Sequence, residues 1–563
     1  MDYRDNLQKW LDFGQYDYGM LKELEDITDE KELEDRFYTE LAFGTAGMRG
    51  KIGMGTNRIN VYVVARATQG LARYLLAADS ANADKGVAIA YDSRHFSQEF
   101  AQVSAQVLAA NGIKAYLFDD LRPVPVLSFT VRHLGTAAGI VITASHNTKI
   151  YNGYKVYGPD GGQITEEAAG AVVAQIRKVT DYFGVELAAD DDAHIITVPP
   201  EVDDAYAAAV EAVARANPGS DLKIIYTPLH GSGNIPVRRV LKDLGYEHVS
   251  VVKEQELPDG DFPTVAKPNP EEKAVFNIAI GMAEKEGADI IFGTDPDSDR
   301  LGVCCRKPDG DYAVFTGNQT GALLVDHMLE SRDWPDNKAI VKTIVTSEMG
   351  GVIARAHGAA VYNVLTGFKY IGEKMTQWQA DGSHTFVMGY EESYGYLAGD
   401  YARDKDAVVA SALVIEMAQY YKDRGMTLYE ALQSLYEKYG YFEEYVQSIE
   451  LDGIAGKAQI AKIMDAFRAD YFDAFADAKL AAFNDYQSQF SKDFTTGQTT
   501  PLDLPVSNVL KFVFDEDSWY AIRPSGTEPK IKVYYSVKGQ SAADAKAKLE
   551  ELKAAVNERL PEL

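Results

Sequence analysis

The chain has 563 residues, of which 46% are hydrophobic and 25% are charged, a composition that excludes a disordered or fibrous protein. It carries 56 basic and 84 acidic side chains and a formal net charge of −28, so its field disfavours nucleic acid as a partner while a local basic pocket could still bind a small anion. At roughly 150 residues per domain, this length predicts about four domains.

The sequence indicates a soluble, cytoplasmic protein. Cys304 and Cys305 are adjacent, which is not the spacing of a structural disulfide and points to a reducing compartment. The first residues lack the apolar core of a signal peptide. The most apolar helical stretch, residues 407–418, is interrupted by Glu416 and is too short to span a bilayer, so we expect no membrane partner.

Short apolar runs alternate with amphipathic stretches along most of the chain, which predicts α/β architecture. Apolar residues spaced three and four apart predict one helix over residues 61–75 and another over residues 96–107, which ends near Asn111-Gly112. Buried strands are predicted over residues 87–90, 139–143, 222–226, 289–292, 339–345 and 385–388.

Three segments repeat one plan, in which a first strand enters a loop and helix and a later strand ends in a polar loop. The first loops are residues 91–94, 227–231 and 346–348, and the second loops are residues 143–147, 293–299 and 389–393. Ligands collect at the carboxyl ends of strands in open α/β sheets. Three similar domains should therefore contribute one loop each to a shared central cleft.

The last part of the chain differs from this plan. Residues 441–492 are acidic and aromatic and are predicted to be mostly helical, followed by strands over 509–514 and 531–536. A closing helix has Ser541 as its N-cap and an apolar face that contains Leu549, Leu552 and Val556. The predicted fold is α/β, with three similar α/β domains and a C-terminal α+β domain that cover residues 1–208, 209–314, 315–435 and 436–563.

An acidic loop, Asp295-Pro296-Asp297-Ser298-Asp299, places carboxylates at alternate positions. Their repulsion is unfavourable without a cation, and hard oxygen ligands favour Mg²⁺ or Ca²⁺. An EF-hand fails because Arg300 and Arg306 stand where it needs Gly and Glu. A solvated acidic turn is the alternative, although apolar strands flank the loop. An octahedral Mg²⁺ shell would leave places for water and a phosphate oxygen, so the loop predicts a phosphoryl group nearby.

Ser145 lies in the segment Thr143-Ala144-Ser145-His146-Asn147, directly after an apolar strand. A hydroxyl at the end of a strand can act as a nucleophile or carry a covalent phosphate. It can equally be a turn serine that bonds its own backbone. A serine hydrolase does not fit, because its nucleophile elbow needs Gly two residues on either side of Ser.

Residues 523–530 offer the guanidinium of Arg523, two hydroxyls and a Gly backbone N–H, a set that fits either a phosphate cradle or a surface turn. Glu391 and Ser393 follow a predicted strand and would point the same way in extended chain, ready for sugar hydroxyls, unless they form an exposed acidic loop. Residues 43–50 are glycine-rich and include Arg49, but they lack the pattern of a dinucleotide site.

Taken together, these segments resemble the α-D-phosphohexomutase superfamily, and in particular its long bacterial phosphoglucomutases, which are related to the animal phosphoglucomutase-2 group. The resemblance covers nearly the whole chain and includes four signature loops in family order. It implies four domains around a deep central cleft and a Mg²⁺-dependent enzyme that moves a phosphoryl group within a sugar phosphate.

The resemblance also implies roles for individual residues. Ser145 would carry the phosphoryl group, Lys155 would be the general acid–base, and His146 would complete the catalytic set. The metal would be held by Ser145, Asp295, Asp297 and Asp299. The substrate would be bound by Thr45, Arg49, Arg300, Thr366, Gly367, Glu391, Ser393, Lys405, Arg523, Ser525, Gly526 and Thr527. The family usually has Pro after Ser-His-Asn, and Thr148 at that position bears on the rigidity of the loop.

The activity implied by the resemblance is phosphoglucomutase, which interconverts α-D-glucose 1-phosphate and glucose 6-phosphate through a phosphoserine enzyme. Glucose 1,6-bisphosphate would be both the intermediate and the activator. A covalent shuttle is needed because O1 and O6 are too far apart for direct transfer. Phosphomannomutase and phosphopentomutase are alternatives within the family. A Mg²⁺-dependent phosphatase that uses Ser145, or a cation-binding protein, is an alternative of another class.

Overall fold

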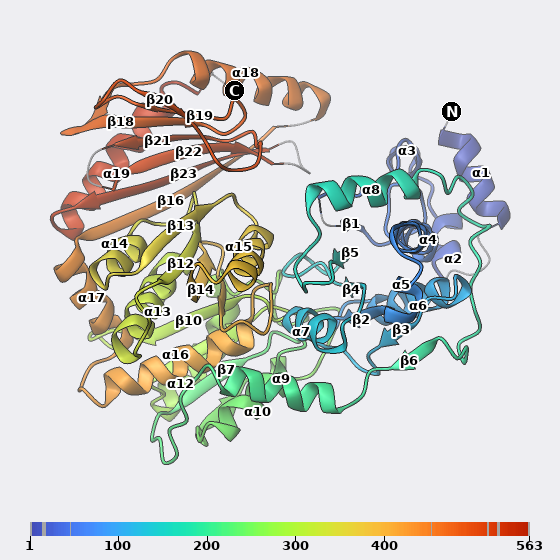
Figure 1. The fold of residues 1–563 in the computed structure, drawn as a ribbon, viewed down its shortest axis with the longest axis horizontal. Coiled ribbons are helices and arrows are strands. Elements are labelled where there is room, and N and C mark those ends of the chain that lie inside the picture. Colours follow the sequence, from blue (N-terminus) through green and yellow to red (C-terminus); the bar gives the residue numbers. More distant parts are fainter. Residues whose placement is uncertain are drawn as a thin grey trace.

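The computed structural model describes residues 3–13, 19–45, 47–451, 453–514, 517–525 and 530–560, without the side chains of 453–455 and 457. The chain forms four sheets with helices packed around them (Figure 1). In chain order, the sheets come from residues 47–197, 224–314, 338–398 and 441–539. We call the parts built on them units one to four.

Unit one has a six-stranded sheet. Its strands are β1 (Gly47–Lys51), β2 (Val87–Tyr91), β3 (Ala115–Leu117), β4 (Ala138–Ile142), β5 (Tyr151–Tyr157) and β6 (Ile195–Thr197), in the spatial order β1-β5-β4-β2-β3-β6. Its helices are α1 (Tyr3–Phe13), α2 (Met20–Glu25), α3 (Glu30–Phe37), α4 (Val61–Ala78), α5 (Asn82–Lys85), α6 (Ser97–Ala110), α7 (Val124–Leu134), α8 (Glu166–Ile176) and α9 (Glu201–Glu211).

Units two and three are smaller. Unit two has strands β7 (Ile224–Thr227), β8 (Val249–Val251), β9 (Ile290–Thr294), β10 (Leu301–Arg306) and β11 (Tyr312–Val314), with helices α10 (Asn234–Asp243), α11 (Lys253–Glu256), the 3₁₀ turn η1 (Lys273–Phe276) and α12 (Asn277–Glu286). Unit three has strands β12 (Lys338–Thr343), β13 (Ala360–Val364), β14 (Thr385–Glu391) and β15 (Gly395–Ala398), with helices α13 (Gly317–Ser331), α14 (Met349–Ala356), α15 (Phe368–Asp381), α16 (Ala407–Lys422) and α17 (Leu428–Tyr439).

The first three units share one four-strand arrangement, which confirms the repeated plan. The spatial orders are β5-β4-β2-β3, β10-β9-β7-β8 and β15-β14-β12-β13. In each unit the two central strands are parallel, and the outer neighbour of β4, β9 or β14 runs antiparallel to it. The three predicted polar loops therefore follow equivalent strands.

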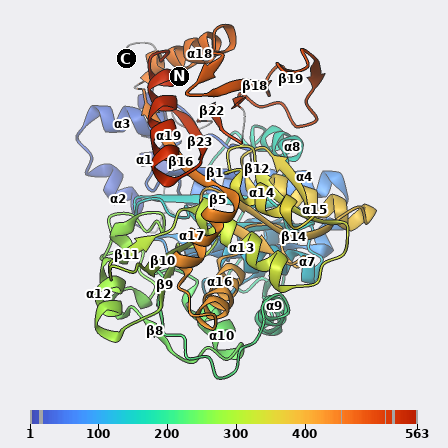
Figure 2. The same cartoon turned by 90° about the vertical axis from the view of Figure 1, so that its left-hand side faces the viewer.

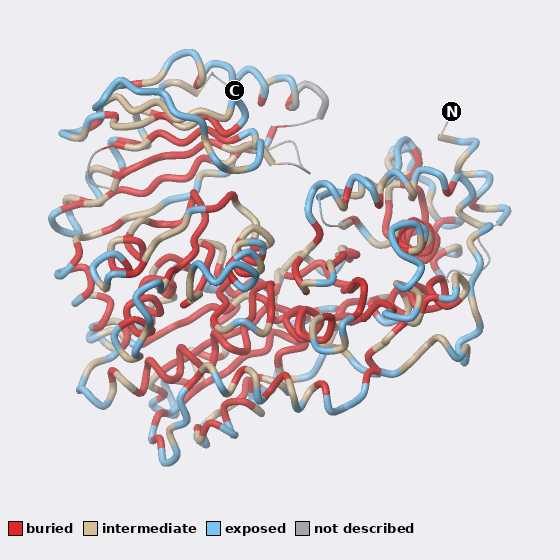
Figure 3. The backbone as a smooth tube through the Cα atoms, in the orientation of Figure 1, coloured by how far each residue is buried: buried red, intermediate tan, exposed pale blue. Residues whose placement is uncertain are grey.

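Burial explains why β2, β4 and β9 are apolar along their whole length. Every residue of β2, β4 and β9 is buried, as expected for strands covered on both faces. Figure 3 shows buried residues concentrated in the central part of the molecule and exposed ones along the outer helices. The predicted helices are confirmed as α4 and α6, and Asn111 is the C-cap of α6.

Unit four has strands β16 (Tyr441–Glu450), β17 (Ala474–Phe475), β18 (Ala478–Asp485), β19 (Phe490–Asp493), β20 (Thr499–Pro501), β21 (Leu510–Phe514), β22 (Trp519–Pro524) and β23 (Lys530–Gly539), with helices α18 (Gly453–Ala469) and α19 (Ala542–Asn557). Figures 1 and 2 both place it beyond unit three, at the top of the view. The N-cap Ser541 is confirmed, because its side chain accepts the N–H of Asp544, and the predicted apolar face of α19 is buried.

The expectation that residues 441–492 are mostly helical is wrong. They form β16 to β19 and a single helix, α18. β16 pairs with β23 along its whole length, from Tyr441 opposite Gly539 to Glu450 opposite Lys530. This long-range pairing outweighs the local preference of an acidic segment, and the α+β class of the unit is unaffected.

Two further observations bear on the predicted domain limits and location. Helix α9 crosses the predicted limit at residues 208 and 209, and the limits themselves stay a prediction. Both cysteines are free and buried. Among the described residues, no helix combines the length and apolar character needed to cross a bilayer.

Candidate active site

Ser145 lies near the start of the connection between β4 and β5 and is buried, with 3% of its surface exposed. Its hydroxyl donates to Asp295 Oδ2 at 2.7 Å and lies 3.2 Å from His146 Nδ1. Its backbone is left-handed, with φ of 52°. This conformation costs a non-glycine residue about 1–2 kcal/mol, so the surrounding structure must hold it.

Arg94, which sequence analysis did not single out as a site residue, supplies much of that support. Its guanidinium is buried and donates to four backbone carbonyls of the serine loop, those of Ser145, Asn147, Thr148 and Tyr151. The distances to the Thr148 and Tyr151 carbonyl oxygens are 2.9 and 3.0 Å. The loop is therefore anchored by Arg94 although Thr148 replaces the usual proline.

Asp92 and Thr143 complete the support around the serine. The Thr143 hydroxyl oxygen accepts the Ser145 N–H at 2.8 Å and lies 2.7 Å from Asp92 Oδ2 and 3.1 Å from Asp297 Oδ2. Asp92 also lies 3.3 Å from Arg94 Nε. The available signal for Asp92 and Arg94 was their place after β2, since β2 lies beside β4 and runs parallel to it.

Replacing Arg94 tests this support. Arg94→Gln should leave Asp92 as an uncompensated buried charge and free the carbonyls of the loop, which lowers the free energy of unfolding by about 3–5 kcal/mol. Denaturant unfolding measures the loss, with Arg73→Gln on α4 as the control. A variant as stable as the wild type would contradict this role for Arg94.

Asp295, Asp297 and Asp299 are buried, and one carboxylate oxygen of each lies within 4.8 Å of the others. The backbone N–H groups of Asp299 and Arg300 donate to Asp295 Oδ1 at 3.1 and 3.0 Å. Within the described part of the chain, Asp297 Oδ1 and Asp299 Oδ1 are buried without a hydrogen-bond donor. Unpartnered carboxylate oxygens in a compact buried trio are suitable ligands for a hard divalent cation.

The protonation of the trio reflects burial and mutual repulsion. Burial, followed by the charges of Asp297 and Asp299, raises the pKa of Asp295 well above its usual value. Burial and the charge of Asp297 likewise raise the pKa of Asp299. Burial also disfavours the charged form of Asp297. The ammonium of Lys155, together with other contacts of Asp297, has the larger effect, so the pKa of Asp297 is lowered. A bound cation would offset the repulsion that remains.

Two lysines from different units face the trio. Lys155 on β5 lies with its Nζ 3.0 Å from Asp297 Oδ2 and 3.7 Å from Asp299 Oδ2. Lys405, just before α16, lies with its Nζ 3.2 Å from Asp299 Oδ2. Burial alone would lower the pKa of Lys405, but the charges of Asp299 and its neighbours raise it, so Lys405 is an ammonium at neutral pH.

Arg49, Arg300 and His146 lie around the same serine loop. Arg49 on β1 donates from NH1 to Asn147 Oδ1 at 2.9 Å, and the guanidinium of Arg300 contacts Glu271. Burial and the charge of Arg300 lower the pKa of His146 well below its ordinary value, so its ring is neutral at physiological pH.

Glu391 ends β14 and is buried, with its Oε1 accepting the Gly367 N–H at 2.8 Å. Burial, with the charge of Glu392 added, raises the pKa of Glu391 to about 7. The assumption that residues 391–393 are extended is wrong, because the strand ends at Glu391 and Ser393 lies in a turn. The Thr366 hydroxyl is buried and has no partner among the described residues.

Among the described residues, no hydrogen bond or ion pair joins Thr45 or Arg523 to the Ser145 cluster. Thr45 is exposed ahead of β1. Arg523 NH1 approaches the Tyr534 hydroxyl at 3.5 Å, and its charge acts on Tyr370 of unit three. The Ser525 N–H donates to the Lys530 carbonyl at 2.8 Å. Gly526 and Thr527 lie outside the described residues.

Four family models match the chain in order. Models of phosphoglucomutase/phosphomannomutase α/β/α domains I, II and III match residues 40–183, 169–310 and 316–439, and the model of the C-terminal domain matches residues 471–555. The chain belongs to the phosphoglucomutase/phosphomannomutase family. It is accordingly an enzyme, an isomerase of the phosphohexomutase class.

Similar proteins agree with this assignment. A phosphoglucomutase of Staphylococcus epidermidis is 38% identical over 531 residues, which cover 94% of this chain and 96% of that protein. A phosphoglucomutase of Staphylococcus aureus is 37% identical over 533 residues, with the same coverage.

Two solved structures share the fold. A phosphoglucomutase/phosphomannomutase family protein of Burkholderia thailandensis has a TM-score of 0.69 at 19% identity and covers 93% of this chain and 98% of its own. The open form of parafusin, a phosphoglucomutase of Paramecium, has a TM-score of 0.65 at 16% identity and covers 93% and 95%.

Proposed function

We propose that the enzyme is a phosphoglucomutase, which interconverts α-D-glucose 1-phosphate and glucose 6-phosphate through a phosphorylated Ser145 and glucose 1,6-bisphosphate. The observation that carries the proposal is the contact of the buried Ser145 hydroxyl with Asp295, at 2.7 Å, within a trio of buried aspartates. The names of the similar proteins support glucose as the sugar.

Asp295, Asp297 and Asp299 would hold Mg²⁺ together with an oxygen of Ser145. The unpartnered oxygens of Asp297 and Asp299 fit this role. When bound, the ion would offset the negative charge of the transferred phosphoryl group. Arg49 and Arg300, which lie around the serine loop, would add positive charge on the side of the substrate.

The transfer requires one bond to form as another breaks. A sugar hydroxyl oxygen attacks the phosphorus, the bond from phosphorus to Ser145 Oγ breaks, and Oγ keeps the electron pair. The proton of the attacking hydroxyl would pass to Lys155 in its uncharged amine form, because its Nζ lies beside the trio at 3.0 Å from Asp297, and the ammonium so formed would return the proton in the reverse step. The bisphosphate then turns over, and its other phosphoryl group returns to Oγ by the reverse step.

The remaining residues would bind the sugar phosphate in either orientation. Glu391, with Gly367 beside it, would accept sugar hydroxyls, and Ser393 and Thr366 would lie at the same edge. Arg523, Ser525, Gly526 and Thr527 would hold the phosphate that does not react, with Thr45 on the opposite side. The four predicted domains would enclose the substrate in a central cleft. We also propose a cytoplasmic location, with sugar phosphates as partners.

A coupled assay of glucose, mannose and ribose 1-phosphates, primed with the matching bisphosphate, tests this function. We expect the largest kcat/KM with glucose 1-phosphate, stimulation by glucose 1,6-bisphosphate, and little release of inorganic phosphate. A preference for mannose or ribose would redirect the substrate assignment. Steady phosphate release without isomerisation would indicate a phosphatase.

The pKa of Glu391 predicts a pH dependence. As the pH falls through about 7, Glu391 gains a proton and loses its capacity to accept sugar hydroxyls, so kcat/KM should fall. The substrate phosphate titrates in the same range, and the ratio of wild type to Glu391→Gln at each pH cancels that contribution. We expect this ratio to rise from pH 6 to pH 8 by about tenfold. A ratio that is independent of pH would contradict the role of Glu391.

A further inference from the structure

We infer that Asp404 is a positioning residue that holds the Lys405 ammonium at the active site by linking it to unit one. This inference rests on the proposed function, in which Lys405 binds the sugar phosphate. Asp404 is 1% exposed, so its charge must be compensated by the groups around it.

Each oxygen of Asp404 has a different set of donors. Oδ2 accepts the Tyr157 hydroxyl at 2.8 Å and the Gln163 amide at 3.0 Å, both from unit one. Oδ1 accepts the backbone N–H of Lys405 at 2.8 Å and its Nζ at 3.0 Å. The Asp404 carboxylate therefore connects β5 and the segment after it to Lys405, in the segment that precedes α16.

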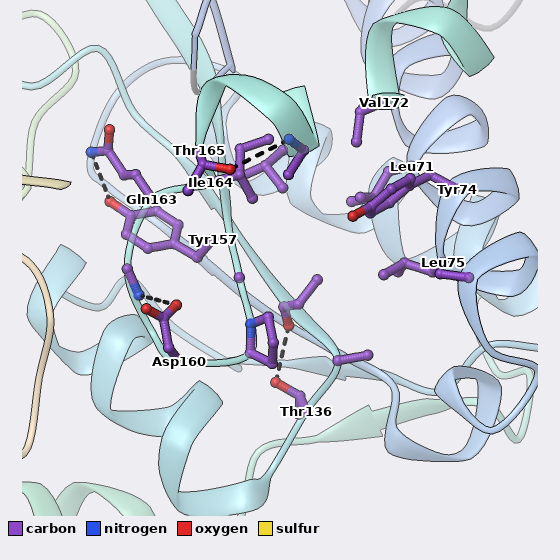
Figure 4. A pocket seen from close by; sticks show the side chains of 18 of the residues that line it. Leu71, Tyr74, Leu75, Thr136, Tyr157, Asp160, Gln163, Ile164, Thr165 and Val172 are labelled. Atoms are coloured by element: carbon purple, nitrogen blue, oxygen red, sulfur yellow. Dashed lines mark hydrogen bonds between the residues drawn. The ribbon is translucent and has the colours of Figure 1, made fainter. Parts of the chain in front are cut away.

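The two donors from unit one, Tyr157 and Gln163, also contact each other. Figure 4 shows the Gln163 amide directed at the Tyr157 hydroxyl, and the two atoms are 3.4 Å apart. Both residues line a cavity of about 650 Å³ whose walls come from unit one and from α15. None of the residues placed above around Ser145 or the aspartate trio lines this cavity, so the cavity is separate from the active site.

Lys405 is placed between two carboxylates, Asp404 at 3.0 Å and Asp299 at 3.2 Å. A cation held by the trio would compete with Lys405 for the Asp299 carboxylate. Asp404 takes no part in the trio, so it would keep the ammonium in place while Asp299 binds the cation. The stem of Lys405 passes over Gly395, where a Cβ atom would lie 2.2 Å from Lys405 Cδ, which further restricts its path.

Through Lys405, the contacts of Asp404 affect substrate binding and not only the stability of the fold. The charge of Glu391 also acts on Lys405, so the ammonium lies within electrostatic range of the proposed sugar site as well as beside the trio. If Lys405 binds the substrate equally in the ground and transition states, loss of its positioning raises KM more than it changes kcat.

Asp404→Asn, which keeps the size and removes the charge, tests the inference. We expect the KM for glucose 1-phosphate and the Kd for glucose 6-phosphate, measured by calorimetry, to rise about tenfold or more, with a smaller change in kcat. Asp400→Asn, at an exposed position in the same segment, is the matched control and should behave as the wild type. Tyr157→Phe should shift both constants in the same direction by less, and it decides the question if Asp404→Asn does not fold.

Combining Asp404→Asn with Lys405→Ala separates positioning from general stability. If Asp404 acts through Lys405, the double variant should bind glucose 6-phosphate as Lys405→Ala alone does. Additive effects, or wild-type constants in Asp404→Asn and Tyr157→Phe, would overturn the inference. Because binding is measured independently of turnover, a wild type without mutase activity would reject the proposed function while the binding data still decide the role of Asp404.

Discussion

Ser145→Ala is expected to lower kcat by at least about a thousandfold, because it removes the oxygen that carries the phosphoryl group. The protein should remain folded, since the hydroxyl is one of several contacts that hold this loop and the bonds from Arg94 to the backbone carbonyls of the loop do not involve the Ser145 side chain. The measurement is the isomerisation of glucose 1-phosphate in the presence of glucose 1,6-bisphosphate, with circular dichroism and thermal unfolding to verify the fold.

Ser145→Gly is the matched second variant. Glycine adopts the left-handed backbone at this position without strain, so it separates the loss of the hydroxyl from any change in loop conformation. Both variants should be equally inactive. Retention of a tenth or more of the wild-type kcat in either variant would show that the phosphoryl group does not travel through this side chain.

Asp295→Asn is expected to weaken Mg²⁺ binding by at least about tenfold and to lower kcat by about a hundredfold or more. Mg²⁺ at a hundred times its Kd should stabilise the wild type by about 2.7 kcal/mol, and this gain should largely vanish in the variant. Without metal, the substitution removes one of three repelling buried carboxylates, so the variant should unfold at the same temperature as the wild type or higher.

The variant is therefore expected to be less stable than the wild type only when Mg²⁺ is present. Thermal unfolding with EDTA and with Mg²⁺ measures both limits in one experiment. Asp309→Asn is the control, because Asp309 lies in the same unit with its side chain 64% exposed. An Asp295→Asn variant that binds Mg²⁺ with wild-type affinity would contradict the assignment of the trio.

The parts of the fold that sequence analysis predicted correctly are those that local patterns determine. Helix α4 buries one face, so its apolar residues recur at the helical period, and β4 and β9 are buried throughout, so they are continuously apolar. The sequence predicts a helical region over β16 because its residues include adjacent glutamates, and only its pairing with β23 makes it a strand. That pairing joins segments far apart in the chain and leaves no local pattern.

In the candidate site too, local patterns predict some residues, and contacts that are remote in sequence determine the others. The aspartate trio lies within five consecutive residues and has a recognisable chemical pattern, and Ser145 was found through its place after a strand. No local pattern predicts Arg94 and Asp404, because their roles depend on partners that are remote in sequence, such as Tyr151 for Arg94 and Tyr157 for Asp404. The pKa of Glu391 likewise arises from burial, which only the folded structure determines.

The most direct test of the account is to locate the phosphoryl group during turnover. Enzyme incubated with ³²P-labelled glucose 1-phosphate and Mg²⁺ would be quenched in acid, digested and analysed by peptide mass spectrometry. We expect one phosphoryl group on Ser145, which unlabelled glucose 1-phosphate displaces as fast as the enzyme turns over. Full activity with no label on Ser145, or with the label on another side chain, would contradict the central claim.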